Sequence, residues 1–386
     1  MQKFNVPTPL GLYIHLPWCV RKCPYCDFNS HELRNALPET AYVDALIQDF
    51  EEHLPAIWGR RISTIFFGGG TPSLFSPAAI ERILTEINAR SAFHADIEIT
   101  MEANPGTLDE SRFTGFRQAG INRVSLGVQS LQDEKLKTLG RIHNREYALR
   151  AVDMLKKAGF DNFNLDFMHG LPNQSIDDAL SDLREAIACE PTHLSWYQLT
   201  IEPNTFFHHH PPALPAEEVL WEIQEQGKAL LTDAGFMQYE VSAYAKNNRV
   251  CAHNVNYWEF GDYLGIGAGA HSKLTHTDKQ IMTRHWQVKN PRDYLHPDKK
   301  FVAEEKAISE HEAVFEFMLN ALRLTHGVPL TLFAERTGLT LDSIQPQLKL
   351  AYEKKLLIDN PNILCPSELG HRFLNDLVAM FLGHAD

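Results

Sequence analysis

Over its first 240 residues, the chain alternates short apolar segments with longer segments that carry apolar residues at helical spacing. The strand-like segments are Leu10–Leu16, Ile62–Phe67, Asp96–Ala103, Arg123–Val128, Asn162–Met168 and His193–Leu199. The helix-like segments that follow them are Glu39–His53, Pro77–Ala89, a stretch from Leu108, Arg145–Ala158, Ile176–Ala188 and Ala216–Ala234. Repeated strand–helix units build parallel sheets, because each helix returns the chain to the start of the next strand. Six such units predict an α/β fold whose sheet forms a partial (β/α)6 barrel.

The pattern changes after Gly235. Gln238–Tyr244 has the pattern of one more strand, and Cys251–Ser272 is rich in aromatic residues and glycine. Pro291–Lys306 is polar and interrupted by prolines, so we expect it to act as a linker.

From Ser309 onward the sequence is mostly helical in pattern. Leu356–Cys365 is a hairpin candidate, and a final helix is expected over Pro366–Leu382. Helices followed by a short hairpin predict a small, mainly helical, winged-helix-like domain. We therefore expect three parts, namely the partial barrel over 1–245, an aromatic and glycine-rich extension with its linker over 246–300, and the C-terminal domain over 301–386.

The charge balance excludes several classes of partner. Lys and Arg number 36 against 49 Asp and Glu, which gives a net charge of −13. An acidic chain has no general attraction for phosphate backbones or anionic lipids, so no nucleic-acid partner is expected. No window approaches the roughly 18 apolar residues of a membrane span, and the first residues lack the apolar core of a signal peptide. We therefore expect no transmembrane segment and a cytoplasmic protein.

Three of the six cysteines lie within eight residues, as Cys19-x3-Cys23-x2-Cys26. An apolar stripe on a helix has the same spacing, but Pro24 inside the motif disfavours a helix. The segment directly follows the first strand, where the functional loops of a barrel lie. Three thiolates leave zinc one ligand short, and His15 is the candidate fourth ligand. They suit a cubane iron–sulfur cluster better, because each thiolate holds one iron and the fourth iron stays open.

The sequence around these cysteines, Tyr13-Ile-His-Leu-Pro-Trp-Cys19-x3-Cys23-Pro-Tyr-Cys26-Asp-Phe, resembles the signature of the radical S-adenosylmethionine (SAM) superfamily. It is most similar to the branch that contains anaerobic coproporphyrinogen III dehydrogenase and a group of haem chaperones. The resemblance implies a radical-SAM partial barrel with a [4Fe-4S] cluster on Cys19, Cys23 and Cys26. It also implies that SAM binds the open iron, and that a donor such as a flavodoxin or ferredoxin supplies the electron that cleaves SAM.

The second predicted strand ends in Gly68-Gly69-Gly70-Thr71-Pro72-Ser73. By itself this is an ordinary strand-to-helix turn, but it matches the family's GGGTP segment, whose backbone meets the methionine ammonium of SAM. Further polar residues fall at or near predicted strand ends, where their alternative role is that of satisfied polar groups in a barrel mouth. The SAM contacts that the resemblance implies are Tyr13, Gly69, Gly70, Thr71, Glu102, Gln129, Arg141 and Asp166.

A later motif, His253-Asn254-Val-Asn-Tyr257-Trp258, matches the H-N-x-x-Y-W pattern of the haem-chaperone branch. The match implies that His253, Asn254, Tyr257 and Trp258 contact haem. The alternative is a hydrogen-bonded wall that closes the barrel. We interpret Cys251 as a packed thiol and His208–His210 as a solvated loop.

Two departures separate the chain from the dehydrogenase pattern. Phe28 stands where that pattern has a further cysteine. The dehydrogenase also has a longer segment before its cluster, whereas eighteen residues precede Cys19 here. The first hypothesis is therefore a haem chaperone that binds haem and passes it to an acceptor protein. The alternatives are oxidative decarboxylation of coproporphyrinogen III and a non-catalytic iron–sulfur interaction module. Whether the chain is an enzyme stays open, and no catalytic residue is assigned.

Overall fold

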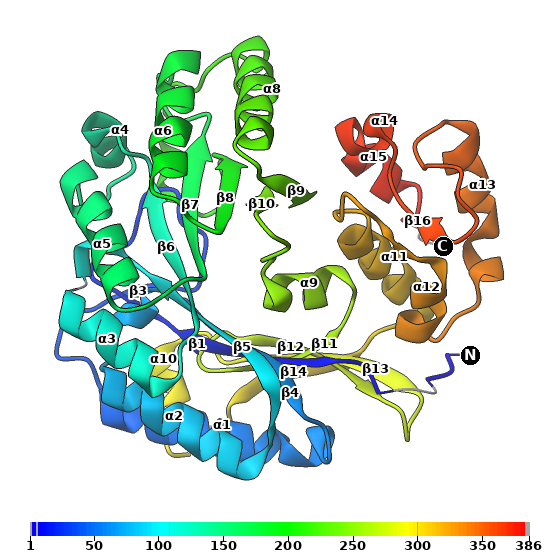
Figure 1. The fold of residues 1–386 in the computed structure, drawn as a ribbon. Coiled ribbons are helices and arrows are strands. Elements are labelled where there is room, and N and C mark those ends of the chain that lie inside the picture. The colour runs from blue at the N-terminus through cyan, green and yellow to red at the C-terminus, as the bar shows by residue number, and fades with distance from the viewer. Residues whose placement is uncertain (1, 5–6, 108, 299, 383–386) are drawn as a thin grey trace.

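The computed structural model describes residues 2–4, 7–107, 109–298 and 300–382. Its central element is a sheet that contains six parallel strands in chain order (Figure 1). These are β1 (Leu10–Leu16), β4 (Ile62–Gly69), β5 (Phe93–Ala103), β6 (Arg123–Gln129), β7 (Phe163–His169) and β8 (His193–Gln198). The α/β class and the partial (β/α)6 barrel are thus confirmed.

Helices cover the outer face of this curved sheet (Figure 1). The main ones are α1 (Glu39–Ile57), α2 (Pro77–Arg90), α3 (Glu110–Ala119), α5 (Arg145–Lys157), α6 (Ile176–Ala188) and α8 (Glu217–Asp233), with the short α4 (Asp133–Thr138) between β6 and α5. Side-chain caps fix several of their starts: Ser76, Asn144 and Ser175 each accept a hydrogen bond from a backbone N–H of the first turn. The expected start at Leu108 lies outside the described residues, and α3 begins after the capping residue Asp109.

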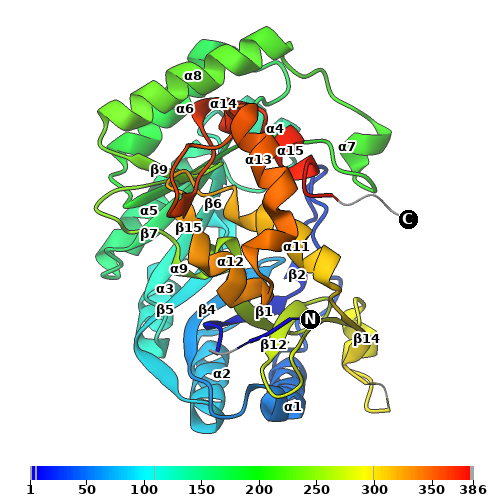
Figure 2. The ribbon, with the colours of Figure 1, turned by 90° about the vertical axis from the view of Figure 1, so that its right-hand side faces the viewer.

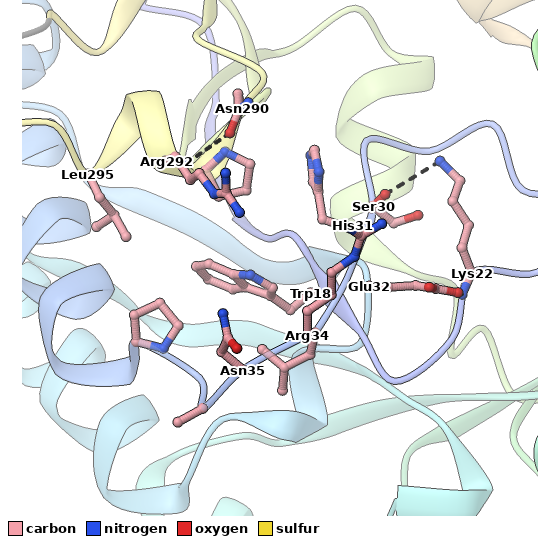
Figure 3. Close-up of a pocket in the computed structure, with 14 residues that line it drawn as sticks. Trp18, Lys22, Ser30, His31, Glu32, Arg34, Asn35, Asn290, Arg292 and Leu295 are labelled. Atoms are coloured by element: carbon pink, nitrogen blue, oxygen red, sulfur yellow. Dashed lines mark hydrogen bonds between the residues drawn. The ribbon is translucent and has the colours of Figure 1, made fainter.

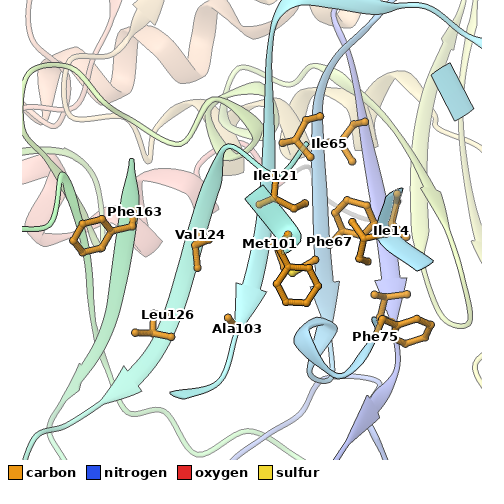
Figure 4. Close-up of a cluster of buried hydrophobic side chains, with 14 of the residues drawn as sticks. Ile14, Ile65, Phe67, Phe75, Met101, Ala103, Ile121, Val124, Leu126 and Phe163 are labelled. Atoms are coloured by element: carbon orange, nitrogen blue, oxygen red, sulfur yellow. The ribbon is translucent and has the colours of Figure 1, made fainter. Parts of the chain in front are cut away.

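Alternation along the strands separates the core from the interior of the barrel. Figure 4 shows one set, with Ile65, Phe67 and Met101 buried between sheet and helices. The residues between them face the other way, because successive strand side chains point to opposite faces. Glu102 and Asp166 belong to this second set, so each strand contributes both apolar packing and a polar lining to the barrel interior.

One edge of the sheet differs from the expected single strand at 238–244. The segment forms two short antiparallel strands, β9 (Met237–Glu240) and β10 (Ala243–Ala245), and β10 pairs with β8. The backbone N–H of Ser242 donates to Glu240 Oε1 (2.9 Å), which stabilises the reversal between them.

The other edge extends well past the predicted barrel. After α9 (Ala252–Trp258), β11 (Asp262–Ile266) inserts parallel to β1, and β12 (His271–His276), β13 (Ile281–Gln287) and β14 (Val302–Ala307) add antiparallel. The linker expected at 291–306 is therefore wrong, because that segment contains the short helix α10 (Pro291–Tyr294) and β14. Among the described residues the twelve-stranded sheet stays open, with β14 and β9 at its ends. The boundaries at 245 and 300 stay a prediction.

A buried ionic group fixes β11 to β12. The carboxylate of Asp262, fully buried, contacts the ammonium of Lys273 (3.1 Å) and the guanidinium of Arg60 (2.9 Å). Lys273 also donates to the carbonyl oxygen of Phe260 (3.1 Å). These cations lower the pKa of Asp262 against the opposing effect of burial.

The C-terminal part is a small helical unit (Figure 2). Its core also includes residues from the edge of the large sheet, such as Tyr239 and Ala243. Its elements are α11 (Glu310–Ala321), β15 (Val328–Pro329), α12 (Leu330–Thr337), α13 (Gln345–Glu353), β16 (Ile363–Leu364), α14 (Glu368–Arg372) and α15 (Leu374–Ala379). Leu357 bridges Pro366 across the expected hairpin, and β16 also pairs with β15. The single final helix is instead divided at Phe373 into α14 and α15. No helix in the described part of the chain is long and apolar enough to cross a membrane.

Candidate cofactor site

The cysteine loop leaves the end of β1 and forms one wall of a cavity of about 410 Å³. Cys19 lies in β2 (Trp18–Cys19), which pairs with β3 (His31–Glu32), and the backbone N–H of Cys26 donates to Cys23 O (3.1 Å). All three thiols are free and line the cavity, Cys19 buried and the other two half-buried. Burial raises the pKa of the Cys19 and Cys26 thiols.

The donor set fits a polynuclear cluster better than a single metal ion. Nowhere in the described ranges do three or more His, Cys, Asp or Glu side chains gather as ligands of one ion. Three thiols that face one cavity from one loop suit a cluster in which each thiolate holds its own iron. The guanidinium of Arg141 donates to Cys23 Sγ (3.5 Å), so a positive charge already stands beside the ligand set.

His15, the candidate zinc ligand, is engaged elsewhere. Its Nδ1 is hydrogen-bonded to the hydroxyl of Tyr13 (2.9 Å) and its Nε2 to the carbonyl oxygen of Asn29 (2.9 Å). Burial lowers the pKa of His15 to about 4, so the imidazole is neutral. The residue therefore ties β1 to the cysteine loop.

The glycine segment after β4 packs directly against that loop. Gly70 N–H donates to Leu16 O (2.9 Å) and Thr71 N–H to Trp18 O (2.8 Å). A Cβ on Gly70 would stand 2.5 Å from Trp18 O, so only glycine fits there. Gly69, with φ 114°, donates its N–H to Glu102 Oε2 (3.2 Å). Because these N–H groups are used within the protein, a ligand ammonium would meet carbonyl oxygens here.

Two inward carboxyl groups lie beside the glycine segment. Burial and the nearby Asp166 raise the pKa of Glu102 to about 8, against the opposing hydrogen bond from Gly69. Asp166 accepts hydrogen bonds from Ser125 Oγ (2.9 Å) and Asn164 Nδ2 (2.7 Å), and burial raises its pKa as well. Within the described part of the chain, Glu102 thus has a backbone partner but no side-chain partner, whereas both carboxylate oxygens of Asp166 are hydrogen-bonded.

The structure brings seven of the eight expected SAM contacts into this one cavity: Gly69, Gly70, Thr71, Glu102, Gln129, Arg141 and Asp166. Tyr13 instead lines an adjoining cavity of about 600 Å³, which shares Cys26, Phe28, Gly69 and Glu102 with the first.

Sequence reasoning missed several lining residues. Tyr197 donates its hydroxyl hydrogen to Gln129 Oε1 (2.8 Å), and Ser195 lines the cavity two positions earlier on β8. The alternation of side chains between the two faces of β8 could have indicated that both residues face the barrel interior. Arg323 of the C-terminal unit also reaches the cavity, where it pairs with Glu240 (2.9 Å) and lies over the ring of Trp258 (4.3 Å). No local sequence signal marks Arg323, because its neighbours come from distant segments.

The H-N-x-x-Y-W motif forms α9 and is divided between cavity and wall. Asn254 and Trp258 line the first cavity and Tyr257 lines the second. His253 is buried, with Nδ1 hydrogen-bonded to Thr64 Oγ1 (2.9 Å) and Nε2 to the hydroxyl of Tyr257 (2.8 Å). Both ring nitrogens are therefore occupied in this conformation, which corresponds to the hydrogen-bonded wall. Burial lowers the pKa of His253 to about 3.

The histidine run is a short helix and differs from the expected loop. Phe206–His209 forms α7, and the backbone N–H of Phe207 donates to Pro24 O (3.0 Å) in the cysteine loop. His208, His209 and His210 are exposed, as expected. Cys251 is a buried thiol whose Sγ donates to Glu98 Oε1 (3.6 Å), in agreement with a packed role.

A further cavity, of about 620 Å³, opens beside the same loop and shares no lining residue with the first (Figure 3). Trp18 contributes an apolar wall and Lys22, Arg34 and Arg292 contribute positive charge. Arg34 and Arg292 are exposed, and neither guanidinium has an ion pair in the described part of the chain. This surface is cationic although the whole chain is acidic.

Comparison with known proteins agrees with this geometry. The radical SAM superfamily model matches residues 13–186, and the HemN C-terminal domain model matches 308–373. The crystal structure of coproporphyrinogen III oxidase (HemN) from Escherichia coli, described as a radical SAM enzyme, superposes with a TM-score of 0.82 at 22% identity, over 97% of this chain and 90% of that one. The fold and the cysteine signature therefore define a radical SAM protein.

Relatives of similar length narrow the class. A protein named heme chaperone HemW from Haemophilus influenzae is 50% identical over 97% of this chain and 98% of its own length. The protein of the same name from Escherichia coli is 49% identical, with the same coverage of both chains. The chain belongs to the HemW family.

Proposed function

We propose that the protein is a haem chaperone that binds haem and passes it to an acceptor protein, and that it carries a [4Fe-4S] cluster and SAM. The names of the relatives support the first part. The observation that supports the second is that one cavity gathers three free cysteines with the polar ends of neighbouring strands.

The chain's own residues suit these cofactors. Cys19, Cys23 and Cys26 would hold three irons, and the Arg141 guanidinium would offset the negative charge of the thiolates. Glu102 would accept hydrogen bonds from the ribose hydroxyls of SAM. When bound, the two cofactors supply the one-electron chemistry that cleaves SAM. The walls of the cavity would exclude water from that chemistry.

Iron loading tests the cofactor part. Anaerobic reconstitution with iron and sulfide should give about four irons per chain, and replacing any one of the three loop cysteines by serine should lower iron content and SAM binding. Cys189→Ser is the matched control, because Cys189 is a free, half-buried cysteine at the end of α6, outside the cavity lining. Full iron content in the loop variants would overturn the cluster assignment.

Haem transfer tests the chaperone part. Protein loaded with one haem should lose it to an apo-haem protein on mixing, and the acceptor spectrum should appear as the donor spectrum disappears. Failure of the unmodified protein to bind haem would refute the function.

The anaerobic assay with SAM, reductant and coproporphyrinogen III should give no decarboxylated product, since Phe28 stands in place of a cysteine. If the protein were a non-catalytic iron–sulfur interaction module, no 5′-deoxyadenosine would form under these conditions. Our proposal predicts that it forms.

The cationic cavity of Figure 3 suits an acidic electron donor such as a flavodoxin or ferredoxin. Trp18 lines this cavity while its neighbour Cys19 lines the cofactor cavity, so only the loop separates them. Unpaired surface cations steer acidic partners and raise association rates by 10-fold or more. Arg34→Glu/Arg292→Glu should slow reduction by flavodoxin about 10-fold at low salt and leave photoreduction by deazaflavin unchanged.

The control for this donor surface is Arg61→Glu/Arg184→Glu, which changes two exposed arginines by the same charge away from the loop. Equal rates for the two double variants would refute the docking surface. If Arg34→Glu/Arg292→Glu also lost photoreduction by deazaflavin, the substitutions would have damaged the cluster site itself.

A further inference from the structure

The adjoining cavity of about 600 Å³ has the chemistry of a porphyrin site. Its wall includes three tyrosines, Tyr13, Tyr257 and Tyr263, together with Phe28. Phe28 is 60% exposed, although it is a large apolar side chain. Flat aromatic side chains pack against aromatic faces, so these four side chains give the cavity an aromatic wall against which a macrocycle can pack.

An accessible imidazole stands in the same cavity. His271, the first residue of β12, is exposed, and its ring nitrogens have no hydrogen bond in the described ranges. Among the rings of the described residues it contacts that of Trp286, at 5.9 Å between centroids. Partial burial of its ring, with the nearby Arg284 and Lys289, lowers the pKa of His271, which favours the neutral ring that binds iron. His253, by contrast, has both nitrogens engaged.

Two lysines complete the site. Lys22 and Lys289 both line the cavity and both are exposed. Lys22 Nζ donates to Phe28 O (3.1 Å) and Ser30 O (3.4 Å), which holds that ammonium at the wall. The carboxyl groups at this cavity are Asp27, which is exposed, and Glu102, which is half-buried. Positive charge at the rim suits a ligand that carries carboxylates.

We propose that this cavity is the haem site, with His271 as an axial ligand, the tyrosines and Phe28 against the macrocycle, and Lys22 and Lys289 near the two propionates. The inference rests on the proposed chaperone function and locates it. The step is a ligand exchange: the imidazole lone pair forms one bond to ferric iron, one water leaves, and nothing is oxidised or reduced. The shared wall of Cys26 and Glu102 would put haem beside the cofactor cavity.

The test uses the full chain without an affinity tag, titrated with ferric haem and followed by visible absorbance. His271→Ala should weaken binding at least 10-fold and remove the histidine-ligated spectrum, and added imidazole should restore that spectrum. His94→Ala is the matched control, since His94 is also exposed but lies at the start of the strand β5 and does not line the cavity. An unchanged spectrum in His271→Ala would overturn the assignment.

Further arms separate this inference from its rivals. Lys289→Glu should weaken haem more than haem dimethyl ester, which lacks the carboxylates; equal weakening would contradict the propionate contact. If replacing all of His208–His210 by alanine abolished haem binding while His271→Ala did not, these histidines at α7 would be the haem ligands instead. If the unmodified chain bound no haem, the chaperone proposal itself would fail, a result distinct from failure of the His271 assignment alone.

Discussion

The raised pKa of Glu102 predicts that SAM binds more tightly as pH rises from 6 to 8. Burial and Asp166 hold this pKa at about 8, so the free protein carries a proton on Glu102 at neutral pH. Hydrogen bonds from ribose hydroxyls favour the ionised form, so binding must release that proton. The ionised fraction is about 1% at pH 6 and about half at pH 8, which gives an affinity ratio of about 50. At pH 7, the release of the Glu102 proton lowers the free energy gained on SAM binding by about 1.4 kcal/mol.

The assay is equilibrium binding of SAM to the cluster-loaded protein at pH 6, 7 and 8. Glu102→Gln removes the titration and keeps the shape, so it should retain only the pH dependence that the SAM amino group contributes. Asp96→Asn is the matched control, because Asp96 is an exposed carboxylate on the same strand. Identical pH profiles for Glu102→Gln and the unmodified protein would refute the reasoning.

Three predictions concern stability. Lys273→Met should lower the free energy of unfolding in urea by about 3 kcal/mol, which is the low end for a broken buried ion pair because Arg60 still contacts Asp262. Adding Asp262→Asn should recover most of the lost stability. A double variant less stable than Lys273→Met alone would contradict this account. Gly227→Ala should cost about 1–3 kcal/mol despite better helix propensity, because the new Cβ would overlap a buried tryptophan ring on β8; a gain in Tm would argue against it. Arg323→Ala should make the C-terminal unit more sensitive to limited proteolysis, since it removes the ion pair and the ring contact that join it to the cavity; an unchanged digestion pattern would count against that role.

The six strands of the partial barrel were predictable because each is marked by its own apolar residues. β14 was not, since five of its six residues, Ala303–Ala307, are exposed and polar or small, without the alternation that marks a half-buried strand. The β9–β10 reversal at Val241–Ser242 likewise lacks the glycine or asparagine that signals a tight turn.

The candidate site likewise contains residues that the sequence could predict and residues that it could not. Glu102 and Asp166 were found because a family pattern and the strand ends coincide. His271 was not singled out, since an isolated histidine at a strand start carries no signal until Tyr257 and Lys289 are seen around the same cavity. Contacts between distant segments, such as that of Arg323, can be read only from the folded chain.

The position of β11 beside β1 governs when the cysteine loop can form. β1 has only β4 as a neighbour until residues 262–266 have been synthesised. Asn29 then anchors the loop through Nδ2 hydrogen bonds to Ala268 O (2.8 Å) and Lys289 O (2.9 Å). Pairing across more than 240 residues is slow, because a long segment of chain must be ordered first. On the ribosome, the cysteines emerge early and their geometry is completed late, so loading of the proposed cluster would come at the end of folding.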